Sequence, residues 1–190
     1  MGDLELVTLA AKGDRDAFSV LVDRYCRYVY AICHKVSLHE EDALDITQIV
    51  FMKLIETIHT FDGRGAFRPW LATIATHEAI DYLRSPSRRE RPVDPLVLNG
   101  LADKMYLNGH WRNGEKDARE MIEGGNRKEI IQTAMASLPP QQRAIFTLHL
   151  MEDMRPKEIA VRLGIPAGQV SGQLRRAMAR LREILAAERV

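Results

Sequence analysis

The sequence predicts an all-α protein: two small helical domains joined by a flexible linker, the C-terminal one a helix-turn-helix. Apolar residues recur at helical spacing through most of the 190 residues, and no segment alternates like a half-buried strand. The Pro-rich stretch "SPSRRERPVDP" (85–95) interrupts this pattern, because proline drives the residue before it toward extended conformations. We therefore expect domains over residues 1–84 and 127–190, with residues 85–126 as the linker.

The first domain begins with a predicted helix pair over residues 4–35, separated at "KGD". Residues 40–59 form the next amphipathic segment. Its expected apolar face holds Ile46, Ile49, Val50, Leu54 and Ile58. Its other face is expected to expose Asp45, Gln48, Lys53 and Glu56.

A turn-rich loop, "FDGRGAF" (61–67), follows this segment. Pro69 suits the first turn of a helix, so "WLATIATHEAIDYLR" (70–84) is predicted to be the last helix of the first domain.

The helix-turn-helix is predicted within residues 155–185. Pro156 fits a helix start, Gly164 can adopt the left-handed conformation of a helix C-terminus, and Pro166 opens the second helix. The second helix carries an apolar stripe of Val170, Leu174, Ala177, Met178, Leu181, Ile184 and Leu185. The residues expected to face outward are Gln169, Ser171, Gly172, Gln173, Arg175 and Arg176. Residues 167–179 contain no acid, so this face suits a DNA groove, although a plain helical hairpin remains the alternative.

Charge is distributed unevenly over the two halves. Residues 1–84 carry a net charge of −4 and residues 126–190 a net charge of +5, which suggests modules with different partners. No apolar run reaches the length of a membrane span, and the acidic N-terminus does not resemble a signal peptide. Cys26 and Cys33 are expected to be reduced, buried thiols of a cytoplasmic protein rather than a disulfide or metal site. No cofactor, metal or small-molecule substrate is expected.

Three segments together carry a resemblance to a known family. They are "DITQIVFMKL" (45–54), "FRPWLATIATHEAIDYLR" (67–84) and the basic segment from Ser137 onward. In this order and spacing the chain resembles the sigma-70 family, specifically its small extracytoplasmic-function (group IV) members. The resemblance covers roughly residues 5–84 and 127–187. The segment "GHWRNGE" (109–115) in the linker receives no role.

The resemblance implies a transcription initiation factor without catalysis of its own. It would direct core RNA polymerase to promoters by reading −10 and −35 elements and by assisting DNA melting. The implied contacts to the β′ and β subunits of the polymerase come from Asp45, Gln48, Met52 and Lys53. Those to the −10 element come from Phe61, Arg64, Phe67, Trp70, His77 and Tyr82. Those to the −35 element come from Gln169, Ser171, Gln173, Arg175 and Arg176. For Phe67 and Trp70, core packing is the competing interpretation.

The chain departs from the family pattern at four positions in or beside these sets. Ile49 stands where an acid is usual, His77 where Asn is common, and Ser171 and Gln173 where Lys or Arg is usual. The resemblance further implies a partner that holds the protein inactive, an anti-sigma factor, which could tether it to the membrane. Control by expression level alone is the alternative.

Two other functions are kept open. A dimeric helix-turn-helix regulator would use residues 1–84 for dimerisation or sensing. An enzyme is disfavoured, because the sequence contains no nucleophile–base set, P-loop or spaced metal ligands.

Overall fold

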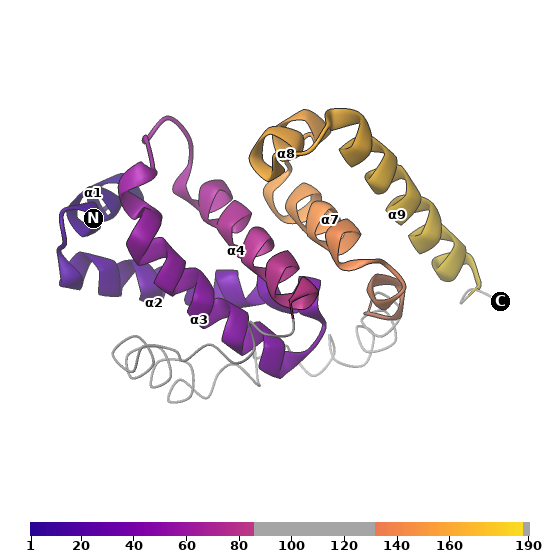
Figure 1. Ribbon diagram of the computed structural model, residues 1–190, viewed down its shortest axis with the longest axis horizontal. Coiled ribbons are helices and arrows are strands. Elements are labelled where there is room, and N and C mark those ends of the chain that lie inside the picture. Colours follow the sequence, from indigo (N-terminus) through magenta and orange to yellow (C-terminus); the bar gives the residue numbers. More distant parts are fainter. Residues whose placement is uncertain (86–131, 188–190) are drawn as a thin grey trace, which may run out of the picture. The chain divides into compact units, whose positions relative to one another are not determined.

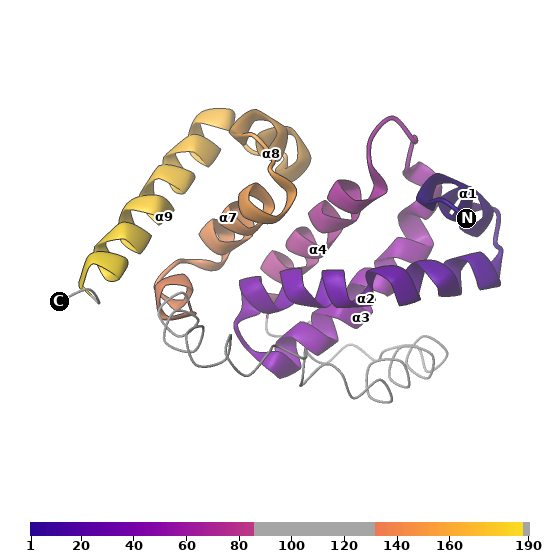
Figure 2. The same ribbon diagram turned by 180° about the vertical axis from the view of Figure 1, so that it is seen from behind.

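A computed structural model describes residues 1–85 and 132–187 of the chain. The chain divides into two compact units, Met1–Leu107 and Asn108–Val190 (Figures 1 and 2). All regular elements in the described ranges are helices, so the all-α prediction is confirmed. The predicted linker, including "GHWRNGE", lies outside the described residues except for Ser85.

The first unit contains α1 (Asp3–Ala11), α2 (Arg15–Ser37), α3 (Glu40–Thr57), the short 3-10 helix η1 (Ile58–Thr60) and α4 (Phe67–Arg84). The predicted break at "KGD" is present, because the Asp14 carboxylate accepts hydrogen bonds from the backbone N–H groups of Asp16 and Ala17, both at 3.0 Å. These bonds satisfy two of the donors that a helix N-terminus leaves free. Leu38 ends α2 in the left-handed conformation.

The core of this unit lies where α2 contacts α1, α3 and α4 (Figure 1). Leu21, Val29, Ile32, Ile46, Leu54 and Leu71 are fully buried there. Cys26 and Cys33 belong to the same core, and neither forms a disulfide. Burial raises the pKa of Cys33 to about 12, so this thiol is held in its unreactive protonated form.

The second unit contains a helical segment over residues 132–136, then α7 (Pro140–Glu152), α8 (Pro156–Leu163) and α9 (Ala167–Ala187). Both α7 and α8 contact α9, and their shared core includes Ile145, Leu148, Ile159, Val170 and Ala177. Arg143 is buried with them, and its guanidinium donates to the Leu138 carbonyl at 2.7 Å.

Candidate nucleic-acid interface

The turn between α8 and α9 has the expected helix-turn-helix geometry. Gly164 takes the left-handed conformation, with φ of 63°, which glycine adopts without steric cost. The Ile165 N–H then donates to the Ala160 carbonyl at 3.1 Å, which closes the end of α8. Pro166 precedes the first residue of α9, so the predicted break between the two helices is confirmed.

The exposed face of α9 is basic and polar. Gln169, Ser171, Arg175 and Arg176 are exposed, whereas Val170, Leu174 and Ala177 are buried against the other helices. Further along the helix, the guanidinium of Arg180 lies 3.9 Å from the carboxylate of Glu183. The face therefore presents cations and hydrogen-bonding side chains with no acid before Glu183, as contact with a phosphate backbone requires.

The outward position expected for Gln173 is wrong. Gln173 is only 6% exposed, and its Oε1 has no hydrogen-bond partner among the described residues. Residue 173 lies three positions after Val170 and four before Ala177, so it shares their side of the helix. Because it is buried, the Gln173 side chain is not part of the surface that could contact base edges.

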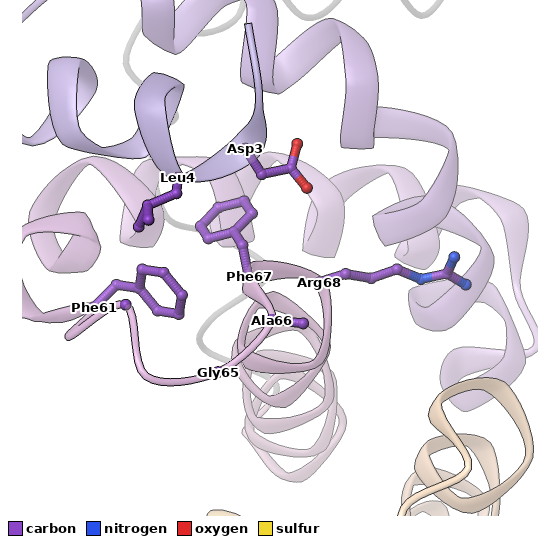
Figure 3. Close-up of a pocket in the computed structure, with 8 residues that line it drawn as sticks. Asp3, Leu4, Phe61, Gly65, Ala66, Phe67 and Arg68 are labelled. Carbon is purple, nitrogen blue, oxygen red and sulfur yellow. The ribbon is translucent and has the colours of Figure 1, made fainter.

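A pocket of about 200 Å³ lies at the predicted loop of the first unit (Figure 3). Its lining combines the start of α1, the loop and the start of α4: Asp3, Leu4, Phe61, Gly63, Gly65, Ala66, Phe67 and Arg68. Figure 3 shows Leu4, Phe61 and Phe67 around the hollow, whereas Arg68 extends away. The Arg68 guanidinium lies over the Tyr28 ring, 4.4 Å from its centroid.

The six side chains expected at the −10 element are divided between surface and core. Phe67 is 3% exposed and Tyr82 is 2% exposed, so neither ring offers the free face that base stacking requires. Phe67 is held edge-on by Tyr25 and Phe61, at centroid distances of 5.3 and 5.5 Å. Phe67 is therefore packed in the core, which is the competing interpretation for this residue.

The remaining four side chains are accessible. Phe61 and Trp70 are partly exposed and lie 5.3 Å apart between centroids. Arg64 and His77 are exposed, and the Arg64 side chain lies 3.8 Å from the carboxylate of Asp62. Arg64 does not line the pocket, so the structure places its charge beside the pocket rather than inside.

On α3 the expected polar surface needs one correction. Asp45 and Lys53 are exposed and Met52 is partly exposed, but Gln48 is only 9% exposed. Ile49, expected in the core, is partly exposed instead. Helical periodicity explains the exchange, because residues 45, 49, 52 and 53 share one side of α3 while residue 48 turns toward the core. Asp45 also accepts a hydrogen bond from the Tyr82 hydroxyl at 3.0 Å.

Sequence reasoning missed Asp3 and Leu4 as pocket residues. The Asp3 carboxylate accepts hydrogen bonds from Arg24 and Tyr25. Burial opposes its ionisation, but these bonds and the charge of Arg24 outweigh burial, and the pKa of Asp3 is lowered. No local pattern could reveal this role, because the pocket joins residues almost sixty positions apart in the sequence.

Residues 1–85 and 132–187 contain no group of three His, Cys, Asp or Glu side chains arranged to hold a metal ion. None of the helices in these ranges is long and apolar enough to cross a membrane.

Comparison with known proteins gives consistent matches over both units. The family model "Sigma-70 region 2" matches residues 21–89, and "Sigma-70, region 4" matches residues 128–181. The ECF RNA polymerase sigma factor SigW of Bacillus subtilis is 31% identical over 176 residues, 92% of this chain and 91% of SigW. The ECF RNA polymerase sigma-E factor of Haemophilus influenzae is 29% identical over 92% of this chain and 90% of its own length.

Solved structures show the same fold. CnrH, determined in complex with the cytosolic domain of CnrY, gives a TM-score of 0.60 at 23% identity and covers 97% of both chains. RpoE of Bartonella quintana, determined with the anti-sigma factor NepR, gives a TM-score of 0.58 at 18% identity, over 89% of this chain and 96% of RpoE. The two region models and the SigW match show that the chain belongs to the extracytoplasmic-function group of the sigma-70 family of RNA polymerase promoter-recognition factors.

Proposed function

We propose that this protein directs core RNA polymerase to promoters that carry particular −10 and −35 elements, and that it performs no catalysis of its own. Residues 1–84 would dock on the polymerase and open the DNA, while residues 127–190 would hold the −35 duplex. The observation that carries the proposal is the pairing of two surfaces in one chain: the face of α9 that holds no acid before Glu183, and the pocket at residues 61–67.

The surface proposed to bind core polymerase is the exposed side of α3. Asp45, Met52 and Lys53 form it, and the partly exposed Ile49 replaces Gln48. An apolar centre with charged side chains around it is typical of protein interfaces. The resemblance to the family supports contacts of this surface with the β′ and β subunits of the polymerase.

The −10 element is proposed to place one unpaired base at the pocket. Extruding a base costs a few kcal/mol, which a stacking surface can offset by about 1–3 kcal/mol per base. Phe61 and Trp70 are the aromatic side chains with accessible surface at this site, so they replace Phe67 and Tyr82 as candidates. Arg64 and His77 are proposed to contact the same element from exposed positions.

The −35 element is proposed to lie along α9. Arg175 and Arg176 would contact phosphates, while Gln169 and Ser171, nearer the helix start, would meet base edges in the major groove. Gln173 is left out because its side chain is buried.

The protein is further proposed to act in the bacterial cytoplasm under the control of an anti-sigma factor, which could tether it to the membrane. The similar RpoE was solved with the anti-sigma factor NepR, which supports this. A partner that covers the exposed side of α3 would block polymerase directly. Affinity purification from unstressed cells should recover a stoichiometric small partner, and recovery of free protein or polymerase subunits alone contradicts the proposal.

Transcription in vitro with purified core polymerase tests the function, followed by sequencing of transcript 5′ ends. Defined start sites preceded by shared −10 and −35 sequences are expected. The double substitution Met52→Ala plus Lys53→Glu should abolish core binding without loss of helicity, whereas Lys12→Glu, a matched charge reversal at the exposed end of α1, should not.

The dimeric-regulator alternative makes opposite predictions. It requires a dimer in size-exclusion chromatography and tight operator binding without polymerase. A monomer that binds promoter DNA well only with core polymerase excludes it.

A further inference from the structure

The pocket at residues 61–67 has a wall that the loop itself does not supply. That wall is the start of α1, where Asp3 and Leu4 line the pocket opposite the loop backbone (Figure 3). The other face of α1 carries Leu6, Val7 and Ala10, which are buried in the core. Leu4 is 59% exposed, so its apolar side chain borders the pocket without being required for core packing.

Leu4 is in close contact with the loop at Gly63. Gly63 has φ of 71°, and a Cβ added there would lie 3.2 Å from Leu4 Cδ1. The left-handed backbone conformation favours glycine at this position, and an added Cβ would displace the Leu4 side chain by a few tenths of an ångström. Gly65, two residues later, has an ordinary φ and nothing within 4 Å of an added Cβ.

The position of α1 is tied to the opposite wall of the pocket through Tyr25. Its hydroxyl donates to Asp3, and its ring meets Phe67 edge-on at an interplanar angle of 71°. Arg24 holds the second Asp3 oxygen, so the carboxylate is fixed from two directions. Leu4, the residue after Asp3, is thereby held at a defined distance from Phe67.

From these contacts we infer that Leu4 is a specificity-determining residue for the −10 element: its side chain sets the width of the pocket that receives the unpaired base, and Asp3 and Tyr25 position it. The inference rests on the proposed function of the loop. An apolar wall contacts every base without forming hydrogen bonds, so it selects by size. A pocket of about 200 Å³ can select a base by its size, because adding or removing a few methyl groups in the wall changes a large share of the pocket volume.

The test uses the full-length protein with core polymerase and a promoter library randomised at the −10 element, with the −35 element constant. Leu4→Phe narrows the pocket and should disfavour purines relative to pyrimidines at one −10 position by about tenfold, a usual effect of small size changes in apolar pockets. Leu4→Ala should shift the same position in the opposite direction. Val20→Ala, which removes an apolar side chain that is 43% exposed and does not line the pocket, is the matched control and should leave the profile unchanged.

Core affinity and helicity, measured for each variant, confirm that it is folded. The variant Gly63→Ala changes the loop itself, so it tests the proposed function of the loop separately from the role of Leu4. Gly65→Ala, in the same loop, is its control. An altered −10 profile for Gly63→Ala with wild-type profiles for both Leu4 variants overturns the inference and leaves the loop assignment intact. Wild-type profiles for Gly63→Ala and both Leu4 variants overturn the loop assignment as well.

Discussion

Within residues 132–187, two buried side-chain oxygens lack hydrogen-bond partners. They are Gln173 Oε1 on α9 and Thr147 Oγ1 on α7. Gln173 is 6% exposed and Thr147 is 2% exposed. A buried polar atom without a partner costs about 1–3 kcal/mol of desolvation, whereas an apolar group of the same shape does not. Each of these atoms therefore lowers the stability of the unit.

Replacing either side chain with an apolar one of similar size should stabilise the protein. We expect Gln173→Leu and Thr147→Val each to raise the free energy of unfolding by about 1 kcal/mol, measured by urea denaturation. Ser171→Ala, an exposed substitution on α9, should change stability by less than about 0.5 kcal/mol. Destabilisation by both substitutions would show that these oxygens have partners in solution.

Asp3 links the stability of the first unit to acid pH. Its pKa in the folded protein lies below its ordinary value of 3.8, so the folded state favours the ionised form. The stabilisation is therefore fully present above the unfolded pKa and is lost as pH falls through the lower folded pKa.

The substitution Asp3→Asn should expose this dependence. The difference in free energy of unfolding between the wild type and Asp3→Asn is expected to be constant near neutral pH and to shrink below about pH 4. Glu5→Gln, at an exposed position in the same first turn of α1, is the control. A difference that does not change between pH 6 and pH 3 contradicts the role assigned to the Asp3 carboxylate.

At the scale of one element, α9 serves two purposes on opposite sides. Val170, Leu174 and Ala177 fix it against α7 and α8, and the other side exposes Arg175 and Arg176. Because the core contacts hold the helix rigidly, its cations have fixed positions relative to the turn at Gly164. A rigid helix can therefore meet DNA without ordering costs beyond its own side chains.

If these cations contact phosphates, the affinity for promoter DNA should depend on the salt concentration. Arg176→Ala in the holoenzyme should weaken promoter binding equally across −35 sequences and lower the slope of log affinity against log salt by about 0.9. Gln169→Ala should instead change which −35 sequences are preferred. Lys12→Ala, outside α9, should retain the wild-type slope, and a wild-type slope for Arg176→Ala would exclude its phosphate contact.

At the scale of the whole molecule, each unit has a hydrophobic core of its own. The first core is formed by α1 to α4 and the second by α7 to α9, so each set of helices buries its own apolar side chains. Separate cores permit separate unfolding, in contrast to a single domain with one cooperative transition.

Calorimetry of the full-length protein should therefore resolve two transitions. Tyr82→Phe removes the hydrogen bond to Asp45 and should lower the midpoint of one transition, whereas Gln173→Leu should raise the other. The effects of the two substitutions should be additive. One transition that moves with either substitution would show that the units unfold together.

The sequence by itself determined the helical class, the break before α2 and the turn of the second unit. These features depend on local chemistry: the Asp14 side chain that starts α2, the left-handed Gly164 that ends α8, and apolar residues that repeat at helical spacing. Local rules suffice here because the interacting groups lie within one or two turns of one another.

Only the tertiary structure decided which borderline positions are buried and where the pocket lies. Gln48 and Gln173 are polar, so pattern reasoning expects them outside, yet helical rotation turns both toward a neighbouring helix. Asp3 and Leu4 line the pocket together with the loop because α1 packs on α2 and η1, a contact between segments far apart in the sequence. Such contacts depend on the packing of whole helices, and side-chain periodicity within one helix carries no information about them.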